Sequence, residues 1–154
     1  MPTIIIDSRE QAPLRFEQAT KSGTLVAGDY SLAGLEELAA IERKSLPDLV
    51  ACCCATNRDR FKRELHRLQS YRCRAVVIEA PLSDALKGAY RSDLHPNALL
   101  AAVASWQIRY AVPFVWADSP AGAARVTLEL LRQFHRQCCR FATGILADLE
   151  KAAT

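Results

Sequence analysis

Residues 38–49 read Leu-Ala-Ala-Ile-Glu-Arg-Lys-Ser-Leu-Pro-Asp-Leu, and this stretch joins a strand to a helix. The mainly apolar run over 38–44 predicts a strand. Ser45 is of a residue type that caps helix N-termini, and Pro47 suits the first turn of a helix. We therefore expect a strand that is followed at once by a helix over about 46–55.

Strands and helices alternate over the rest of the chain. Apolar runs bounded by turn residues predict further strands at 3–6, 23–27, 31–33, 74–80 and 113–117. Further helices are expected at 57–71, 83–86, 97–110 and 119–150, with Thr56 or Asn57 as the cap of the first and a break near Gly144 in the last. This alternation is typical of an α/β sheet with helices on both faces, and we expect one domain over residues 1–154.

The composition is that of an ordinary globular domain. The chain has 154 residues, of which 50% are apolar and 24% charged, and this differs from a disordered chain. The sequence has no run of about 18 uncharged apolar residues, which a transmembrane helix requires. The N-terminus lacks the basic and long apolar regions of a secretory signal, so we expect a cytoplasmic protein, associated with the nucleoid if bacterial.

The six cysteines do not have the spacing of a metal site. They lie at positions 52, 53, 54, 73, 138 and 139, without a Cys-x-x-Cys pair or a histidine that would complete one. In the absence of a secretory signal we expect reduced thiols that serve as small apolar residues.

Positive charge is concentrated in one segment. The net charge is only +3, and arginines outnumber lysines 15 to 5. Between Arg58 and Arg74, seven basic residues accompany two acidic ones, so this segment carries +5 and the rest of the chain −2. A basic helix on a nearly neutral protein is a candidate footprint for a polyanion. A solvated helix face explains the same pattern, and charge alone does not separate the two.

Five carboxylates in the first third of the chain lie at or near expected strand ends: Asp7, Glu10, Asp29, Glu42 and Asp48. Glu42 and Lys44 are two residues apart, so a strand places their side chains on the same face. With Asp29 on a neighbouring strand, two carboxylates can hold a divalent cation, and Asp7 can complete its shell or assist a second ion. Lys44 would orient a water or stabilise the transition-state charge on a phosphate. Taken alone, Glu42 and Lys44 also fit an exposed strand with a surface ion pair.

The combination of these residues is more specific than any pair of them. The chain reads Asp-x-Arg-Glu at 7–10, Gly-Asp at 28–29, and Glu-Arg-Lys followed after three residues by Asp at 42–48. This pattern resembles the nuclease domain of the XPF/MUS-type structure-specific endonucleases. The likeness spans nearly the whole chain, because it extends to the family's next helix, its central strand and its closing helix and strand, at 60–64, 76–79 and 105–115.

The resemblance implies a restriction-endonuclease-like α/β fold, with a mixed central sheet flanked by helices. It implies an endonuclease that cleaves DNA phosphodiesters with Mg²⁺ or Mn²⁺, acting on branched, flapped or forked DNA in repair or recombination. Asp29 and Glu42 are then metal ligands that Asp7 assists, and the backbone carbonyl of Arg43 is a third ligand. Lys44 is the catalytic lysine, and Asp48 supports Arg43 or Lys44.

Basic residues near this motif are candidates for contacts with DNA. They are Arg9, Arg58, Arg60, Lys62 and Arg63. Such residues bind phosphates and position DNA without reading its sequence. Arg9 has a second role open to it, because it can pair with Glu10 or Glu42 and hold the site together.

Many relatives carry a tandem helix-hairpin-helix module after the nuclease domain, but this sequence has no paired Gly-x-Gly hairpin. We therefore expect a stand-alone nuclease domain that forms a homodimer or heterodimer through its C-terminal helices, as the family does. The apolar segments 97–111 and 121–149 suit such an interface, although core packing explains them equally well. Two other functions stay open: a non-catalytic DNA-binding or scaffolding partner of another nuclease, and an α/β domain without a nucleic-acid role.

Overall fold

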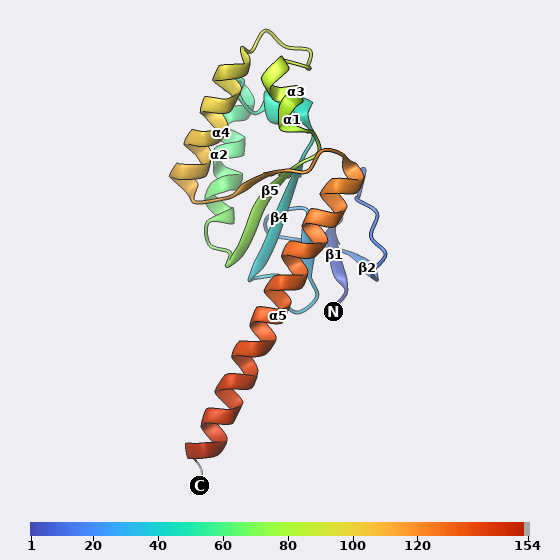
Figure 1. The fold of residues 1–154 in the computed structure, drawn as a ribbon, viewed down its shortest axis with the longest axis vertical. Coiled ribbons are helices and arrows are strands. Elements are labelled where there is room, and N and C mark those ends of the chain that lie inside the picture. Colours follow the sequence, from blue (N-terminus) through green and yellow to red (C-terminus); the bar gives the residue numbers. More distant parts are fainter. Residues whose placement is uncertain (153–154) are drawn as a thin grey trace.

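The structure, a computed structural model, describes residues 1–152 as one sheet with helices on both faces (Figure 1). The strands are β1 (Ile4–Asp7), β2 (Thr20–Gly23), β3 (Tyr30–Leu32), β4 (Ala39–Lys44), β5 (Cys73–Ile78) and β6 (Phe114–Trp116). The helices are α1 (Leu46–Ala51), α2 (Ala55–Leu68), α3 (Leu82–Lys87), α4 (Pro96–Tyr110) and α5 (Pro120–Ala152). Within residues 1–152, none of the helices combines the length and the apolar character needed to cross a bilayer.

The sheet is mixed, which confirms the expected architecture. Its strand order is β2-β1-β3-β4-β5-β6, in which β3 runs antiparallel to both of its neighbours and the other pairs are parallel. β4 pairs with β5 along its full length, from Ala39 opposite Cys73 to Lys44 opposite Ile78. The strand that bears the Glu-Arg-Lys motif is therefore an interior strand of the sheet. Its C-terminal residues lie beside the C-terminal end of β1 and the N-terminal end of β3.

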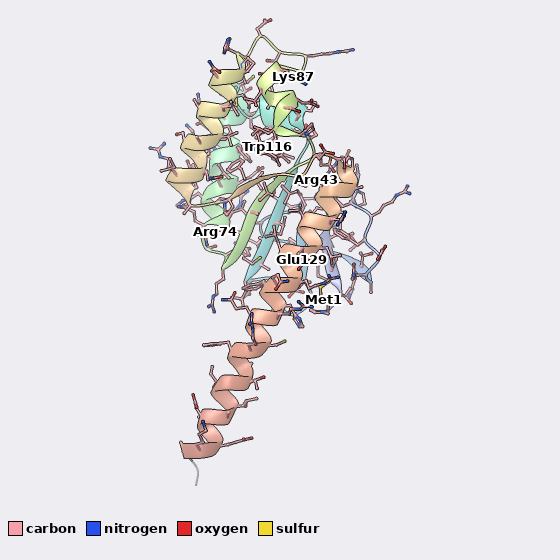
Figure 2. All side chains as sticks on the ribbon, in the orientation of Figure 1. Met1, Arg43, Arg74, Lys87, Trp116 and Glu129 are labelled. Atoms are coloured by element: carbon pink, nitrogen blue, oxygen red, sulfur yellow. The ribbon has the colours of Figure 1, made fainter. Side chains whose placement is uncertain are left out.

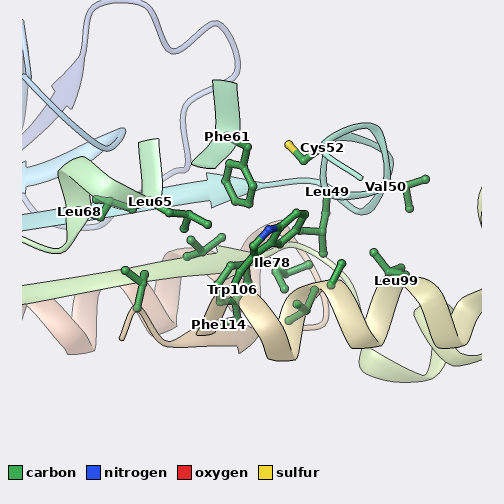
Figure 3. Packing of buried hydrophobic residues seen from close by; sticks show 14 of the residues in the cluster. Leu49, Val50, Cys52, Phe61, Leu65, Leu68, Ile78, Leu99, Trp106 and Phe114 are labelled. Atoms are coloured by element: carbon green, nitrogen blue, oxygen red, sulfur yellow. The ribbon is translucent and has the colours of Figure 1, made fainter. Parts of the chain in front are cut away.

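Alternate residues of the central strands enter two separate cores. The core under α1, α2 and α4 contains three aromatic rings with centroids 5.1 to 6.4 Å apart, those of Phe61, Trp106 and Phe114 (Figure 3). On the other face, α5 covers Ile41 and Val77. Because both faces of the sheet are covered by apolar packing, the side chains at the strand ends are the ones left to form a polar site.

The second strand differs from the expectation. It covers Thr20–Gly23 and not 23–27. β2 is a mostly exposed edge strand of polar residues, so it lacks the apolar pattern that predicts strands. The apolar residues Leu25 and Ala27 are buried in the loop that follows it.

The helix starts differ in how clearly the sequence indicates them. The Ser45 hydroxyl caps α1 as expected, accepting a hydrogen bond from the Asp48 N–H at 3.2 Å. α2 begins earlier than expected, with Cys54 at its N-cap in place of Thr56 or Asn57. Cysteine is not a preferred N-cap residue, so the sequence carries no capping signal at this position.

α5 is a continuous helix of 33 residues, about 50 Å long. The expected break near Gly144 is wrong, because one glycine in an exposed helix costs only about 1 kcal/mol and keeps its backbone hydrogen bonds. The first half of α5 covers the sheet, whereas residues 139–152 are exposed and extend away from the rest of the chain (Figure 1).

Candidate active site

The charged residues of the motif meet in one cleft at the ends of the sheet's strands. β1 and β4 end at this side of the sheet and β3 begins there, because β3 is antiparallel to both. The cleft has a volume of about 620 Å³. All five carboxylates singled out in the sequence line it, together with one lysine from β4 and two arginines from α2. These residues are Asp7, Glu10, Asp29, Glu42, Asp48, Lys44, Arg60 and Arg67.

Lys44 is held over the cleft by two carboxylates and an aromatic ring. Its Nζ lies 2.6 Å from Glu42 Oε1 on the same face of β4, and 3.5 Å from Glu64 Oε2 on α2. The Nζ also lies 5.3 Å from the centre of the Phe61 ring, within the range of a cation–π contact. Burial by itself would lower the pKa of Lys44, but the charges of Glu42 and Glu64 outweigh it, so the pKa lies above its ordinary value and the ammonium stays charged.

Asp29 is placed beside Glu42 by the glycine before it. Gly28 has a φ of +73°, and a Cβ there would lie 3.0 to 3.2 Å from the backbone of Ile41. This close approach allows the Asp29 N–H to donate to the Ile41 carbonyl at 2.8 Å. The Arg43 N–H donates in turn to Asp29 Oδ2 at 2.7 Å, so the Asp29 carboxylate lies against the end of β4.

The half-buried Asp29 and the buried Glu42 are two carboxylates without enough positive charge around them. Burial, followed by the negative charge of Glu42, raises the pKa of Asp29 to about 7. Burial also raises the pKa of Glu42, despite its ion pair with Lys44. Two acids whose ionised forms are disfavoured in this way are stabilised by a cation that binds between them.

The donor set fits a hard divalent cation that keeps several waters. Among residues 1–152, no three His, Cys, Asp or Glu side chains are grouped closely enough to form a complete metal site. Mg²⁺ is typically held by only one or two carboxylates, with water and phosphate oxygens at its remaining positions. Asp29 and Glu42 meet that requirement, since each has an oxygen that makes no hydrogen bond to the described residues.

Asp7 lines the same cleft in a different environment. Arg9 donates to Oδ1 from its backbone N–H at 2.9 Å and from its Nε at 2.7 Å. Oδ2 accepts from the Arg9 guanidinium at 3.0 Å and from the Leu25 N–H at 2.8 Å. The hydrogen bonds from Arg9 hold the pKa of Asp7 at about 2, despite a side chain that is only 3% exposed. Asp7 therefore fixes the loop that leads to Gly28.

Two expected contacts are wrong. Arg9 pairs with Asp7 and the Leu25 carbonyl, not with Glu10 or Glu42, because its backbone folds back over the end of β1. Asp48 was expected to support Arg43 or Lys44. Its Oδ2 instead accepts from the Ser45 hydroxyl at 2.6 Å at the start of α1, and both basic residues have other acidic partners.

Arg43 forms ion pairs with acidic residues that follow β1 and β5, and these partners were not predicted. Its guanidinium lies 2.7 Å from Glu79 Oε2 at the end of β5, and 3.3 Å from Glu10 Oε1 after β1. These partners are 36 and 33 residues away in the chain. A carboxylate at the end of the apolar central strand is the sequence signal that points to Glu79, because such a buried charge needs a partner.

Only part of the basic segment reaches the cleft. Arg60 and Arg67 of α2 line it, and their spacing of seven residues corresponds to about two helical turns, which places them on one face. Arg67 was not among the expected DNA contacts, although this spacing indicates it. Arg58, Lys62 and Arg63 lie elsewhere on α2, outside the cleft lining, and Lys62 pairs with Asp59 at 3.1 Å.

Comparisons with known proteins identify the family and the fold of the chain. Residues 6–130 match the family model described as the ERCC4 domain. The fold is similar to that of XPF from Aeropyrum pernix in complex with DNA, with a TM-score of 0.70 and 24% identity over 89% of this chain and 66% of that one. A second structure of XPF from Aeropyrum pernix matches with a TM-score of 0.66 and 23% identity over 97% of this chain and 73% of the other. A search of curated protein sequences finds no match.

The chain spans about two thirds of the length of the first XPF structure, and at this identity the similarity establishes the fold. The family model covers most of the chain, including the whole Glu-Arg-Lys motif. Both results confirm the resemblance seen in the sequence. The chain therefore belongs to the ERCC4-domain family of XPF-type nucleases.

Proposed function

We propose that this chain is a metal-dependent DNA endonuclease whose nuclease domain covers residues 1–154. The observation that carries the proposal is the meeting of Asp29, Glu42 and Lys44 in one cleft. Membership of the ERCC4-domain family and the similarity to an XPF structure in complex with DNA support DNA as the substrate. The expected preference is for branched, flapped or forked DNA in repair or recombination.

Asp29 and Glu42 would hold Mg²⁺ or Mn²⁺, with the Arg43 carbonyl as a third protein ligand. When bound, such an ion polarises the scissile phosphate and lowers the pKa of a bound water. Burial and nearby negative charges disfavour the ionised forms of both carboxylates, which supports this assignment because a bound cation offsets that cost. Asp7 assists from outside this pair by holding the loop that positions Asp29.

Lys44 acts on the phosphate through its ammonium group. Its Nζ is charged and fixed between Glu42 and Glu64, so it needs little reorganisation to donate to a developing phosphate charge or to an attacking water. Asp48 keeps the turn between β4 and α1 in place through Ser45, which supports the backbone directly after Lys44.

The basic residues around the cleft would bind the DNA backbone. Arg60 and Arg67 line the cleft beside the proposed metal ligands, and the side chain of Arg9 is 69% exposed at its rim. Arg58, Lys62 and Arg63 lie outside the cleft lining on the same helix, and their contact with DNA stays a prediction. We expect Arg60→Ala or Arg67→Ala to weaken DNA binding several-fold and to reduce the salt slope by about one. Arg109→Ala on α4 is the matched control, and an equal effect of Arg109→Ala would contradict this DNA path.

The test of the activity is a cleavage assay on flap, fork, nicked and plain duplex DNA with Mg²⁺ or Mn²⁺. We expect the wild-type chain to cut at least the flap or fork substrate, and Asp29→Asn to abolish cutting while folding persists. Asp93→Asn, at an exposed aspartate, is the matched control. Salt-dependent DNA binding without cleavage under all conditions would overturn the proposal in favour of a non-catalytic partner.

We also propose that the exposed end of α5 pairs with a second copy of the chain. Phe141, Ile145, Leu146 and Leu149 are between 44% and 64% exposed. Their spacing places them on one side of the helix. Side chains project all around this segment, without cover from the sheet (Figure 2). Gly144 lies within this length of the helix, beside the stripe, and a Cβ there would meet nothing within 4 Å.

Charge along this segment favours an antiparallel pair. Arg136 and Arg140 precede the apolar stripe, whereas Asp148 and Glu150 lie at its far end, where Asp148 pairs with Lys151 at 3.5 Å. Antiparallel crossing near Gly144 places the acidic end of one helix beside the arginines of the other. We expect a dimer in sedimentation velocity, and Phe141→Glu with Leu146→Glu to convert it to a monomer. Gln137→Glu is the control, and a monomeric wild-type chain at tens of micromolar would contradict self-association.

A further inference from the structure

A second cavity lies on the opposite face of the sheet from the cleft. It has a volume of about 810 Å³ and is bounded by the loop over residues 12–18 and by the first half of α5. Arg43 and Glu79 also line it. Figure 2 labels Arg43 close to the first turns of α5. The size of the cavity is within the range of small-molecule and cofactor sites.

The cavity combines apolar walls with a cationic rim. Leu14, Phe16 and Leu128 supply apolar surface from two sides. Three arginines surround it, Arg15 from the loop and Arg125 and Arg132 from α5, and Glu17 of the loop also lines it. Arg132 pairs with Glu129 at 3.2 Å. Apolar walls accept a flat ring, and the arginines suit a phosphate, which they bind in a bidentate manner.

Three polar atoms of lining residues lack a hydrogen-bond partner within residues 1–152. They are Glu79 Oε1, Gln18 Oε1 and Arg43 Nε. The Glu79 side chain is only 6% exposed, and its other oxygen is the one that binds Arg43. These atoms have almost no accessible surface, so they lie beneath the cavity wall and are not contact points that a ligand reaches directly.

The cavity suits a ligand with a flat apolar body and a negative charge. A nucleobase offers two apolar faces, and the phosphate of its nucleotide offers the charge. We propose that this cavity binds one nucleotide, with its base between the loop and α5 and its phosphate at Arg15 and Arg125.

The cavity is joined to the proposed active site through Arg43. The guanidinium of Arg43 lies at the cavity, while its backbone N–H binds Asp29 at 2.7 Å. A nucleotide that contacts Arg43 would therefore influence the position of the end of β4, against which the proposed metal ligand Asp29 lies. The nucleotide is either an unpaired residue of the DNA substrate or a free nucleotide; the first source rests on the proposed function, and the second does not.

The first test measures binding of dGMP to the full chain by calorimetry. We expect Arg125→Glu to weaken the affinity at least about tenfold, since a charge-assisted contact to phosphate is lost. Arg109→Glu, at an exposed residue of α4 outside the cavity, should change the affinity less than about twofold. Deoxyribose 5-phosphate should bind at least about tenfold more weakly than dGMP. No binding of dGMP, an equal loss in Arg109→Glu, or equal affinity for deoxyribose 5-phosphate would overturn the proposal.

The second test separates the two sources. Ala121→Trp fills the cavity from an exposed position in the first turn of α5. If it weakens binding of dGMP and of flap DNA at least about tenfold, but not of plain duplex, the nucleotide belongs to the DNA. If it weakens only dGMP binding, the ligand is a free nucleotide, and if it weakens neither, the proposal fails. A chain that cuts no DNA but still binds dGMP through Arg125 would refute the nuclease function and leave this site intact.

Discussion

Asp7 and Asp29 are aspartates of the same cleft that occupy opposite electrostatic environments. The pKa of Asp7 is lowered to about 2 by hydrogen bonds from Arg9, whereas the pKa of Asp29 is raised to about 7 by burial and by Glu42. The difference lies in the donors that surround them. Asp7 accepts four hydrogen bonds, while Asp29 accepts one backbone N–H and lies beside a second acid.

This contrast separates a structural carboxylate from one suited to bind a cation. The charge of Asp7 is already balanced by Arg9, so it stabilises the fold. The negative charge of Asp29 has no positive partner that compensates it, so its ionised form destabilises the folded state. A bound cation would remove this destabilisation. Residues near functional sites often carry such perturbed pKa values, and the direction of the perturbation distinguishes the two roles.

The largest expected effect comes from Asp29→Asn. We expect cleavage to fall at least about a hundredfold, the order of the loss when one preorganised electrostatic contact is removed. We also expect the free energy of unfolding at pH 8, without metal, to stay equal or rise, because the substitution removes a buried and repelled charge. Urea denaturation and a cleavage time course measure both quantities. A large loss of stability would mean that Asp29 is structural and would remove the contrast with Asp7.

The second effect is the reverse pattern in Asp7→Asn. We expect the free energy of unfolding at pH 7 to fall by about 2 to 3 kcal/mol, because Arg9 loses its charged partner and the loop at Leu25 loses an anchor. Cleavage should fall less than in Asp29→Asn when both are compared under conditions where the variants are folded. Unchanged stability together with a complete loss of cleavage would instead assign Asp7 to the metal site.

The smallest effect is an acid dependence carried by Asp7. Its pKa lies below the ordinary value of 3.8, so ionisation favours the folded state; this stabilisation is complete above about pH 4 and is lost as the pH falls toward 2. Because Arg9 is largely exposed and screened by solvent, we expect a contribution between about 1 and 2 kcal/mol. The stability difference between wild type and Asp7→Asn should shrink by this amount between pH 5 and pH 2.5. A stability difference that does not change with pH would show that the charge of Asp7 does not contribute to stability.

The sheet and its motif strand were predictable because their signals are local. β4 and β5 are apolar runs with clear ends, and Ser45 and Pro47 indicate the start of α1. β2 was misplaced because an exposed edge strand has no apolar pattern, and its position depends on pairing with β1. α5 continues through Gly144 because the rest of this long helix stabilises it, and a single glycine in the sequence does not indicate whether a helix ends there.

The composition of the site was predictable, whereas its pairing was not. Glu42 and Lys44 meet because of strand periodicity, so their contact follows from the sequence alone. The partners of Arg43 come from β1 and β5 and depend on the strand order of the folded sheet. The pairing of Arg9 with Asp7 required the local path of the chain after β1, which no periodic pattern describes.

Gly28 has a consequence for the comparison of relatives. Its φ of +73° and its closeness to the Ile41 backbone leave no room for a side chain, so even Gly28→Ala should displace Asp29 while every charged group is retained. A homologue with all the acids and the lysine, but without this glycine, is expected to be inactive. Sorting family members into working enzymes and degenerate copies therefore requires inspection of this uncharged position as well as of the ionisable ones.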